Sequence, residues 1–131
     1  MLAAQAAGAD LAYVGSPFIA TEEANAPSGY KQAIVDGGAA DIVYTEVFTG
    51  VHGNYLRSSI VSAGLDPDAL AGVDPTAMKF GSAGSAKTKA WRDIWGSGQG
   101  IGIVDRIRPA AEFIDSLAEQ YEAARARLCA N

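Results

Sequence analysis

Gly15 and Ser16 are the residues whose types and position best suit the binding of an anion. They follow the apolar stretch 10–14, which is predicted to be a short buried strand, and they precede a predicted helix. In parallel α/β folds, ligands bind at the carboxyl ends of the strands, where backbone N–H groups point outward without partners. The pattern therefore predicts a contact with a phosphate group. A plain turn is the alternative that these two residues leave open.

The stretch 96–102 is the most glycine-dense part of the chain and is the second candidate for a ligand contact. A dinucleotide-binding fingerprint needs glycines in the pattern G-x-G-x-x-G after a strand. Counted from Gly96 the third glycine would fall at Ile101, and counted from Gly98 it would fall at Ile103, so the sequence does not carry that fingerprint. Such glycines let the backbone approach either a ligand or a neighbouring loop closely, and both interpretations stand.

His52 is the single histidine and lies between Gly50 and Gly53, in a segment predicted to be an exposed loop. A lone loop histidine is more often inert than catalytic, and the sequence has no cluster of histidine, cysteine and acidic residues with metal-ligand spacing. We therefore predict no metal site and assign no catalytic residue. Glu22 and Glu23 are adjacent, so on a helix they point in different directions, and we interpret them as first-turn charges.

The composition limits the class of protein. The chain has 131 residues, 49% of them hydrophobic, with 10 Lys and Arg against 15 Asp and Glu. The apolar fraction excludes a disordered tail, and a net charge of -5 without basic runs argues against nucleic acid or a membrane surface as partner. No apolar run has the length of a membrane span. Cys129, the single cysteine, cannot form an intramolecular disulfide, which favours a cytoplasmic location.

Hydrophobic spacing and turn residues predict the elements that position these candidates. Helices are expected at 2–7, 18–24, 28–36, 55–63 and 107–128, with extended segments at 10–14 and 41–48. Thr21 and Ser28 are the expected N-caps of the second and third of these helices, and Pro109 fits the first turn of the last. The order of helix, strand, glycine turn and helix is typical of α/β proteins with parallel sheets.

The start and the length of the chain bear on how much of a fold it can form. No capping residue precedes Leu2, and Gly8 ends the first predicted helix after two turns. Two explanations stay open, namely an internally started reading frame or a short frayed terminal helix. A complete eight-stranded α/β barrel needs about 250 residues, so 131 residues allow one ordinary domain and exclude a full barrel.

Taken together, several segments resemble the nitronate monooxygenase family, whose members are FMN-dependent barrel flavoproteins. The matching text is GADLAYVGSPFIATEEANA at 8–26, YKQAIVD at 30–36, DIVYTEVFTGVHGNYLR at 41–57, KAWRDIWGSGQGIG at 89–102, and the terminal helix. The resemblance spans nearly all of the chain. It implies an α/β fold class in which this chain is the C-terminal fragment of a (β/α)8 TIM barrel with a mostly helical second domain.

The resemblance also divides the chain into three parts. Residues 1–24 would be the last barrel strand with its flanking helices. Residues 25–100 would be a smaller second domain that covers the active site as a lid, and residues 101–131 would be the C-terminal helix that returns to the barrel.

Cofactor contacts are implied at the turn that follows the last barrel strand, because in the family this turn binds the FMN phosphate. By match, the cofactor-binding residues are Tyr13, Val14, Gly15 and Ser16, with Gln99 as a further contact near the flavin. Family members commonly carry Thr and Arg at the positions of Ser16 and Pro17. Serine keeps the hydroxyl, whereas Pro17 gives up an amide donor.

The implied activity is the oxidation of nitronates or nitroalkanes with O2. The family's catalytic histidine precedes the matched region, and we do not expect His52 to replace it. The sequence of the segment 49–54 differs from that of better-known family members, so the resemblance leaves the substrate preference open. We expect the chain to need the missing N-terminal barrel segment and to be inactive alone.

The sequence leaves two other functions open. A flavin-dependent enoyl-carrier-protein reductase shares the barrel and the Gly-Gln turn. A non-enzymatic interaction module, in which 28–95 fold alone as a small helical domain, is the alternative from another class of protein.

Overall fold

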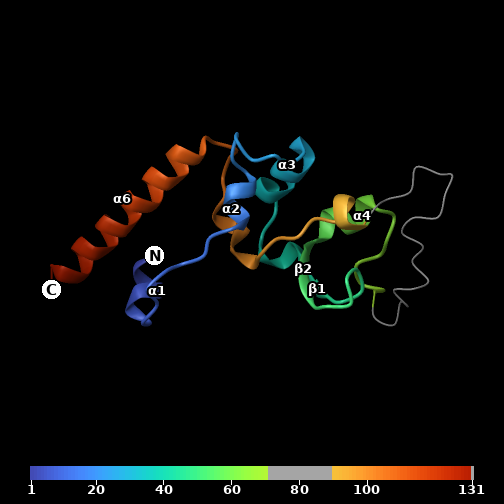
Figure 1. Ribbon diagram of the computed structural model, residues 1–131, viewed down its shortest axis with the longest axis horizontal. Coiled ribbons are helices and arrows are strands. Elements are labelled where there is room, and N and C mark those ends of the chain that lie inside the picture. Colours follow the sequence, from blue (N-terminus) through green and yellow to red (C-terminus); the bar gives the residue numbers. More distant parts are fainter. Residues whose placement is uncertain (71–89, 131) are drawn as a thin grey trace.

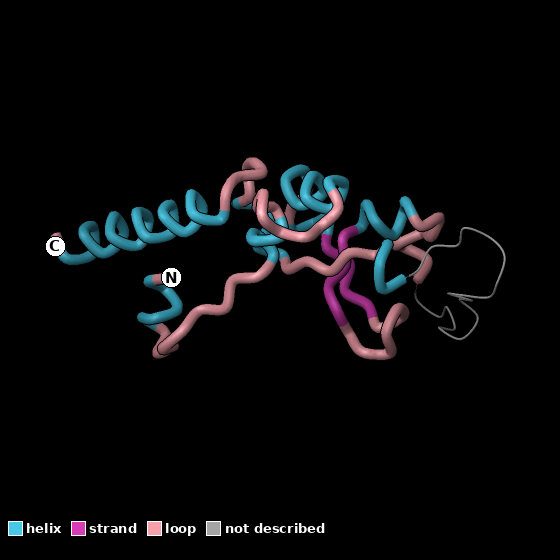
Figure 2. Tube along the Cα trace, turned by 45° about the horizontal axis from the view of Figure 1, so that its top comes forward, coloured by secondary structure: helices cyan, strands magenta, loops and turns pink. Residues whose placement is uncertain are grey.

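The computed structural model describes residues 1–70 and 90–130. They form an elongated molecule in which the long helix α6 (Ala110–Cys129) projects from a central body, and the short helix α1 (Leu2–Ala6) lies beside the far part of α6 (Figure 1). Figure 2 shows the two strands at the opposite side of the body from α6. The stretch 81–85, whose glycine and serine residues predict a loop, lies outside the described residues.

Between these ends, short elements alternate with turns. In chain order they are α2 (Ser16–Ile19), α3 (Ser28–Asp36), the 3-10 helix η1 (Ala39–Asp41), β1 (Ile42–Thr45), β2 (Gly53–Leu56), α4 (Arg57–Ser62), α5 (Ala90–Asp93) and the 3-10 helix η2 (Gln99–Ile103).

Three of the predicted helices are confirmed. α1 ends before Gly8, whose φ of 91° lies in the left-handed region that favours glycine. α3 has the predicted bounds, although Ser28 is its first residue and Pro27 its N-cap. The terminal helix begins at Ala110, three residues later than predicted, so Pro109 is its N-cap and does not lie in its first turn. Arg108 is paired with the backbone at Ala20 and Glu22, which keeps it outside the helix.

The prediction of a strand at 10–14 is wrong for this structure. The segment is extended, but it pairs with no other part of the chain that the structure describes. A strand is held by backbone hydrogen bonds to a neighbouring strand, so extended residues without such a neighbour do not form one. The side chains of Leu11 and Tyr13 are accordingly 89% and 101% exposed.

The prediction of a helix at 18–24 is also wrong, because α2 ends at Ile19. The following backbone pairs with residues just before α6. Glu22 N–H donates to the Arg108 carbonyl at 3.0 Å, and Arg108 N–H donates to the Ala20 carbonyl at 3.4 Å. Thr21 forms a parallel bridge with Arg108, so it is not a helix cap.

β1 and β2 form an antiparallel pair in which Ile42 lies opposite Leu56 and Thr45 lies opposite Gly53. Residues 55 and 56 were predicted to begin a helix, and α4 begins only at Arg57. The reason is non-local, since the backbone beyond α5 pairs with the outer side of β2. Leu56 N–H donates to the Trp95 carbonyl at 2.8 Å, which holds this part of the chain extended.

The main hydrophobic core lies where α2, α3, β2 and η2 meet. Its buried members are Ala20, Ile34, Leu56, Ile101 and Val104. These residues come from all three of the parts that the family resemblance implies, 1–24, 25–100 and 101–131. A second, smaller cluster on the other side of the hairpin consists of Val47, Ile60, Leu70 and Ile94.

Candidate functional site

The structure brings the two glycine-containing candidate segments together. The backbone N–H of Gly98 donates a hydrogen bond to Ser16 Oγ at 2.9 Å, and this contact is partly buried. Gly98 directly precedes Gln99, the first residue of η2. One predicted cofactor contact, Ser16, therefore forms this hydrogen bond. Two others, Gly15 and Gln99, are sequence neighbours of the residues that it joins.

The backbone around Ser16 offers unused donors. The N–H groups of Gly15 and Ser16 have no acceptor among the residues that the structure describes. The Ser16 hydroxyl accepts from Gly98, and a hydroxyl that accepts one hydrogen bond can still donate its own proton. Pro17 adds no donor. Two amides and one hydroxyl are the kind of donors that bind an anion.

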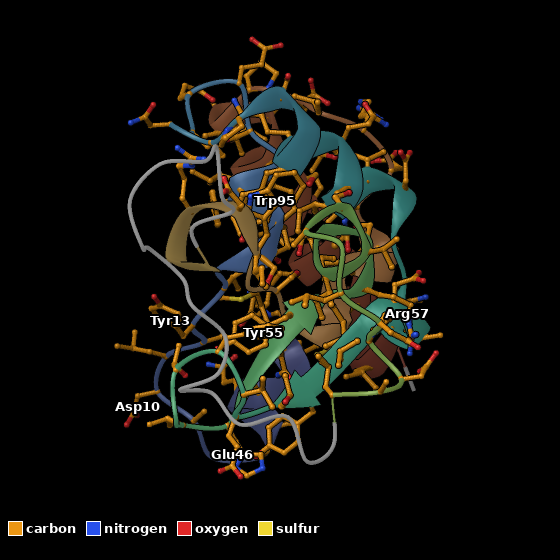
Figure 3. The ribbon with its side chains drawn as sticks, turned by 90° about the vertical axis from the view of Figure 1, so that its right-hand side faces the viewer. Asp10, Tyr13, Glu46, Tyr55, Arg57 and Trp95 are labelled. Atoms are coloured by element: carbon orange, nitrogen blue, oxygen red, sulfur yellow. The ribbon has the colours of Figure 1, made fainter. Side chains whose placement is uncertain are left out.

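The other predicted contacts contribute differently. Tyr13 lies at the edge of the molecule and its side chain is fully exposed, away from the packed side chains around Trp95 (Figure 3). Val14 is half-buried and Gln99 is exposed. The structure thus places the side chains of Tyr13 and Gln99 in solvent.

The segment that carries Gly98 is held on both sides. Ser97 N–H donates to the Asn54 carbonyl at 3.0 Å, and the Tyr30 hydroxyl donates to the Gly96 carbonyl. The Tyr30 ring also stacks on Trp95 at 4.9 Å between ring centroids. Burial raises the pKa of Tyr30 above its ordinary value, which keeps this hydroxyl a donor.

His52 occupies the exposed loop that the sequence predicts. Its Nδ1 lies 3.4 Å from Glu46 Oε2, and its ring lies 4.9 Å from that of Tyr44. Half of its side chain and more than half of that of Glu46 are open to solvent. Nothing in this arrangement connects His52 to the contact between Ser16 and Gly98.

Two residues with specific structural positions were not predicted. Asn54 Oδ1 is buried without a hydrogen-bond partner among the described residues. Glu23 accepts the Ala110 N–H with both carboxylate oxygens, at 2.9 and 3.1 Å, and so caps α6. Adjacent acidic residues do not reveal which distant helix they cap, so no local signal identified this role.

Two further properties concern ligands and membranes. Within residues 1–70 and 90–130, no group of three or more histidine, cysteine, aspartate or glutamate side chains is placed to hold a metal ion. Over the same residues, none of the helices is both long enough and apolar enough to cross a bilayer.

The fold is shared with a solved structure of a FabK mutant from Thermotoga maritima. The likeness has a TM-score of 0.66 at 21% sequence identity, and it covers 98% of this chain and 39% of that chain. It supports an α/β fold of the TIM-barrel type, of which the described residues form a mixed helical part with a small sheet. At this identity the likeness concerns the fold alone.

The sequence comparison defines the class more narrowly. The family described as nitronate monooxygenase matches residues 1–120. The chain belongs to the nitronate monooxygenase family, a family of oxidoreductase enzymes.

A curated relative agrees with this assignment. The nitronate monooxygenase of Paraburkholderia phytofirmans is 29% identical over 126 residues, which cover 92% of this chain and 34% of that protein. The chain thus spans well under half of the length of the relatives that it matches.

Proposed function

We propose that this chain forms part of an FMN-dependent nitronate monooxygenase that oxidises nitronates with O2, and that it binds the phosphate of FMN. The observation that carries the proposal is the hydrogen bond between Gly98 and Ser16, since it joins the two segments that the family resemblance assigns to the cofactor. The family membership supports the oxidoreductase class.

The residues present fit a phosphate group. The N–H groups of Gly15 and Ser16 have no acceptor among the described residues, and the Ser16 hydroxyl has a proton to donate. Gly15 is exposed, so a ligand can approach this backbone. Hydrogen bonds from such donors to an ionised acceptor are roughly twice as strong as those between neutral groups.

In this proposal the chain binds the phosphate of FMN and covers the active site, and it does not perform the chemical step. Bound FMN would supply the chemistry by accepting electrons from the nitronate and passing them to O2. Ser16 and the two amides would anchor the phosphate, while residues 25–100 would cover the site and exclude water. Catalytic base chemistry would come from outside the described residues, since His52 lies apart from the contact between Ser16 and Gly98.

FMN binding is tested on the 131-residue chain by following the backbone amide signals in ¹H–¹⁵N NMR spectra. We expect FMN and inorganic phosphate to shift the Gly15 and Ser16 amide signals, and riboflavin, which lacks the phosphate, to leave them in place. Binding should be weak, because two amides and one hydroxyl are a small share of a cofactor site. Amide signals of Gly15 and Ser16 that do not respond to either phosphate compound would contradict the proposal, as would micromolar binding of riboflavin.

The activity is tested by coexpressing the chain with the part of the Paraburkholderia relative that it does not match. We expect O2 uptake with ethyl nitronate from the assembled protein and none from the chain alone. An enoyl thioester with NADH is assayed in parallel, and turnover of that pair alone would favour the reductase alternative. A cytoplasmic location and a need for the N-terminal barrel segment belong to the same proposal.

A further inference from the structure

We infer that Gly98 is a positioning residue for the phosphate of FMN, and that it acts through its backbone N–H on the Ser16 hydroxyl. The inference rests on the proposed function and adds a residue that touches Ser16 and not the cofactor. The two atoms are 2.9 Å apart in a partly buried contact.

The direction of the hydrogen bond determines what Ser16 can do. A serine hydroxyl has one proton and two acceptor positions, and it rotates freely unless a partner fixes it. The N–H of Gly98 occupies one acceptor position of Oγ, so the hydroxyl proton points away from Gly98. An oriented donor loses less entropy when a phosphate oxygen binds to it than a freely rotating donor does.

The N–H of Gly98 is itself held in place. The neighbouring Ser97 is buried, and its N–H donates to the Asn54 carbonyl at 3.0 Å. Gly96 forms an antiparallel bridge with Tyr55, and its carbonyl accepts from Tyr30. Backbone anchored on two successive residues fixes the direction in which the next N–H points.

The geometry at Gly98 allows a matched pair of variants. Its φ of -83° lies close to the value that a proline ring imposes, so Gly98→Pro removes the N–H at a compatible φ. A Cβ at this position would lie 3.6 Å from Ser16 Oγ, which is ordinary van der Waals contact. Gly98→Ala therefore adds carbon but keeps the N–H, and it serves as the control.

The experiment is an NMR titration of the full 131-residue chain with FMN and, separately, with riboflavin. We expect Gly98→Pro to weaken FMN binding at the Gly15 and Ser16 amides by about tenfold, and Gly98→Ala to change it by less than about twofold. Ser16→Ala should weaken FMN binding at least as much as Gly98→Pro does. In the double variant, Gly98→Pro should cause no further loss, because the hydroxyl that it positions is gone.

A second measurement does not depend on the folding of the proline variant. Hydrogen exchange of the Gly98 amide should be slow in the parent chain and faster in Ser16→Ala. FMN binding by Gly98→Pro equal to that of the parent would overturn the inference and leave the proposed function standing. Equal exchange of the Gly98 amide in the parent and in Ser16→Ala would overturn it as well. A parent chain without a phosphate-dependent response would overturn both proposals.

Discussion

The Ser16 hydroxyl and the Gly98 backbone N–H meet at 2.9 Å although 82 positions separate them in the sequence. The contact joins the first residue of α2 to the residue that directly precedes η2. The segment around Gly98 is held by its own hydrogen bonds, whereas the N–H groups of Gly15 and Ser16 have no acceptor among the described residues. The contact thus sets a fixed backbone segment beside two unused donors, which is why the two segments form one candidate site.

The close approach at the end of α3 predicts a steric effect. A Cβ on Gly37 would lie 2.8 Å from the Ala33 carbonyl oxygen and 3.0 Å from Ile101 Cδ1, so backbone and core would have to move. Gly37→Ala should lower the free energy of unfolding by about 1–3 kcal/mol, measured by urea denaturation. Gly100→Ala is the control, because no atom of residues 1–70 or 90–130 lies within 4 Å of a Cβ there. Equal stabilities of the two variants would contradict the packing at Gly37.

The cap on α6 predicts local fraying. Glu23→Ala removes the carboxylate that accepts the Ala110 N–H, and loss of such a cap costs about 1 kcal/mol. Hydrogen exchange should become faster in the first turn of α6, while the far end of the helix should not change. Glu22→Ala is the control, since the Glu22 carboxylate accepts no hydrogen bond within the described parts of the chain. Faster exchange in both variants would indicate a general charge effect instead of a cap.

The burial of Tyr30 predicts a pH dependence of stability. Burial raises the pKa of Tyr30 above the 10.0 of an exposed tyrosine. At pH values above 10.0 the unfolded chain therefore loses this proton before the folded chain does, and the free energy of unfolding falls as the pH rises. The contribution is fully present below pH 10.0 and is lost as the pH rises through the folded-state pKa.

Urea unfolding between about pH 9 and pH 11 measures this effect. The stability of Tyr30→Phe should fall less steeply with pH than that of the parent chain. Tyr44→Phe serves as the control because Tyr44 is 67% exposed, and its stability should fall as steeply as that of the parent. Parallel curves for all three proteins would show that Tyr30 is not the cause.

The buried Oδ1 of Asn54 predicts that an apolar residue can replace this asparagine without loss of stability. This atom has no hydrogen-bond partner among the described residues, and a buried polar atom left without one is unfavourable by about 1–3 kcal/mol. An apolar side chain of similar size removes that penalty. Asn54→Leu should leave the melting temperature unchanged or raise it, whereas Asn54→Ala should lower it by opening space. A clear loss of stability in Asn54→Leu would show that the amide has a partner in solution.

The elements that the sequence predicts well are those whose signals are local. α3 has its predicted bounds because apolar spacing and the pair Gly37 and Gly38 both act within a few residues. The terminal helix is equally evident from its apolar stripe. The strand predicted at 10–14 depends on a neighbouring strand, and the described residues provide none.

The same distinction applies to the candidate site. The residue types at the end of the apolar stretch indicate Gly15 and Ser16, and the family resemblance implies Gln99, but only the fold shows that these residues are adjacent. The extended backbone at Leu56 is fixed by the carbonyl of Trp95, a partner that no periodicity in the sequence indicates. Glu23 was interpreted as a charge on its own helix and instead caps another one.

The main hydrophobic core has a consequence for protein engineering, because its members come from distant parts of the sequence. Ile34 and Leu56 are buried against Ala20, Ile101 and Val104, which flank them in the sequence on both sides. Residues 25–100 are therefore unsuited to transplantation as a cassette between homologous enzymes. A grafted copy would need the donor's own versions of these flanking side chains, and successful chimaeras should have their crossover points outside 20–104.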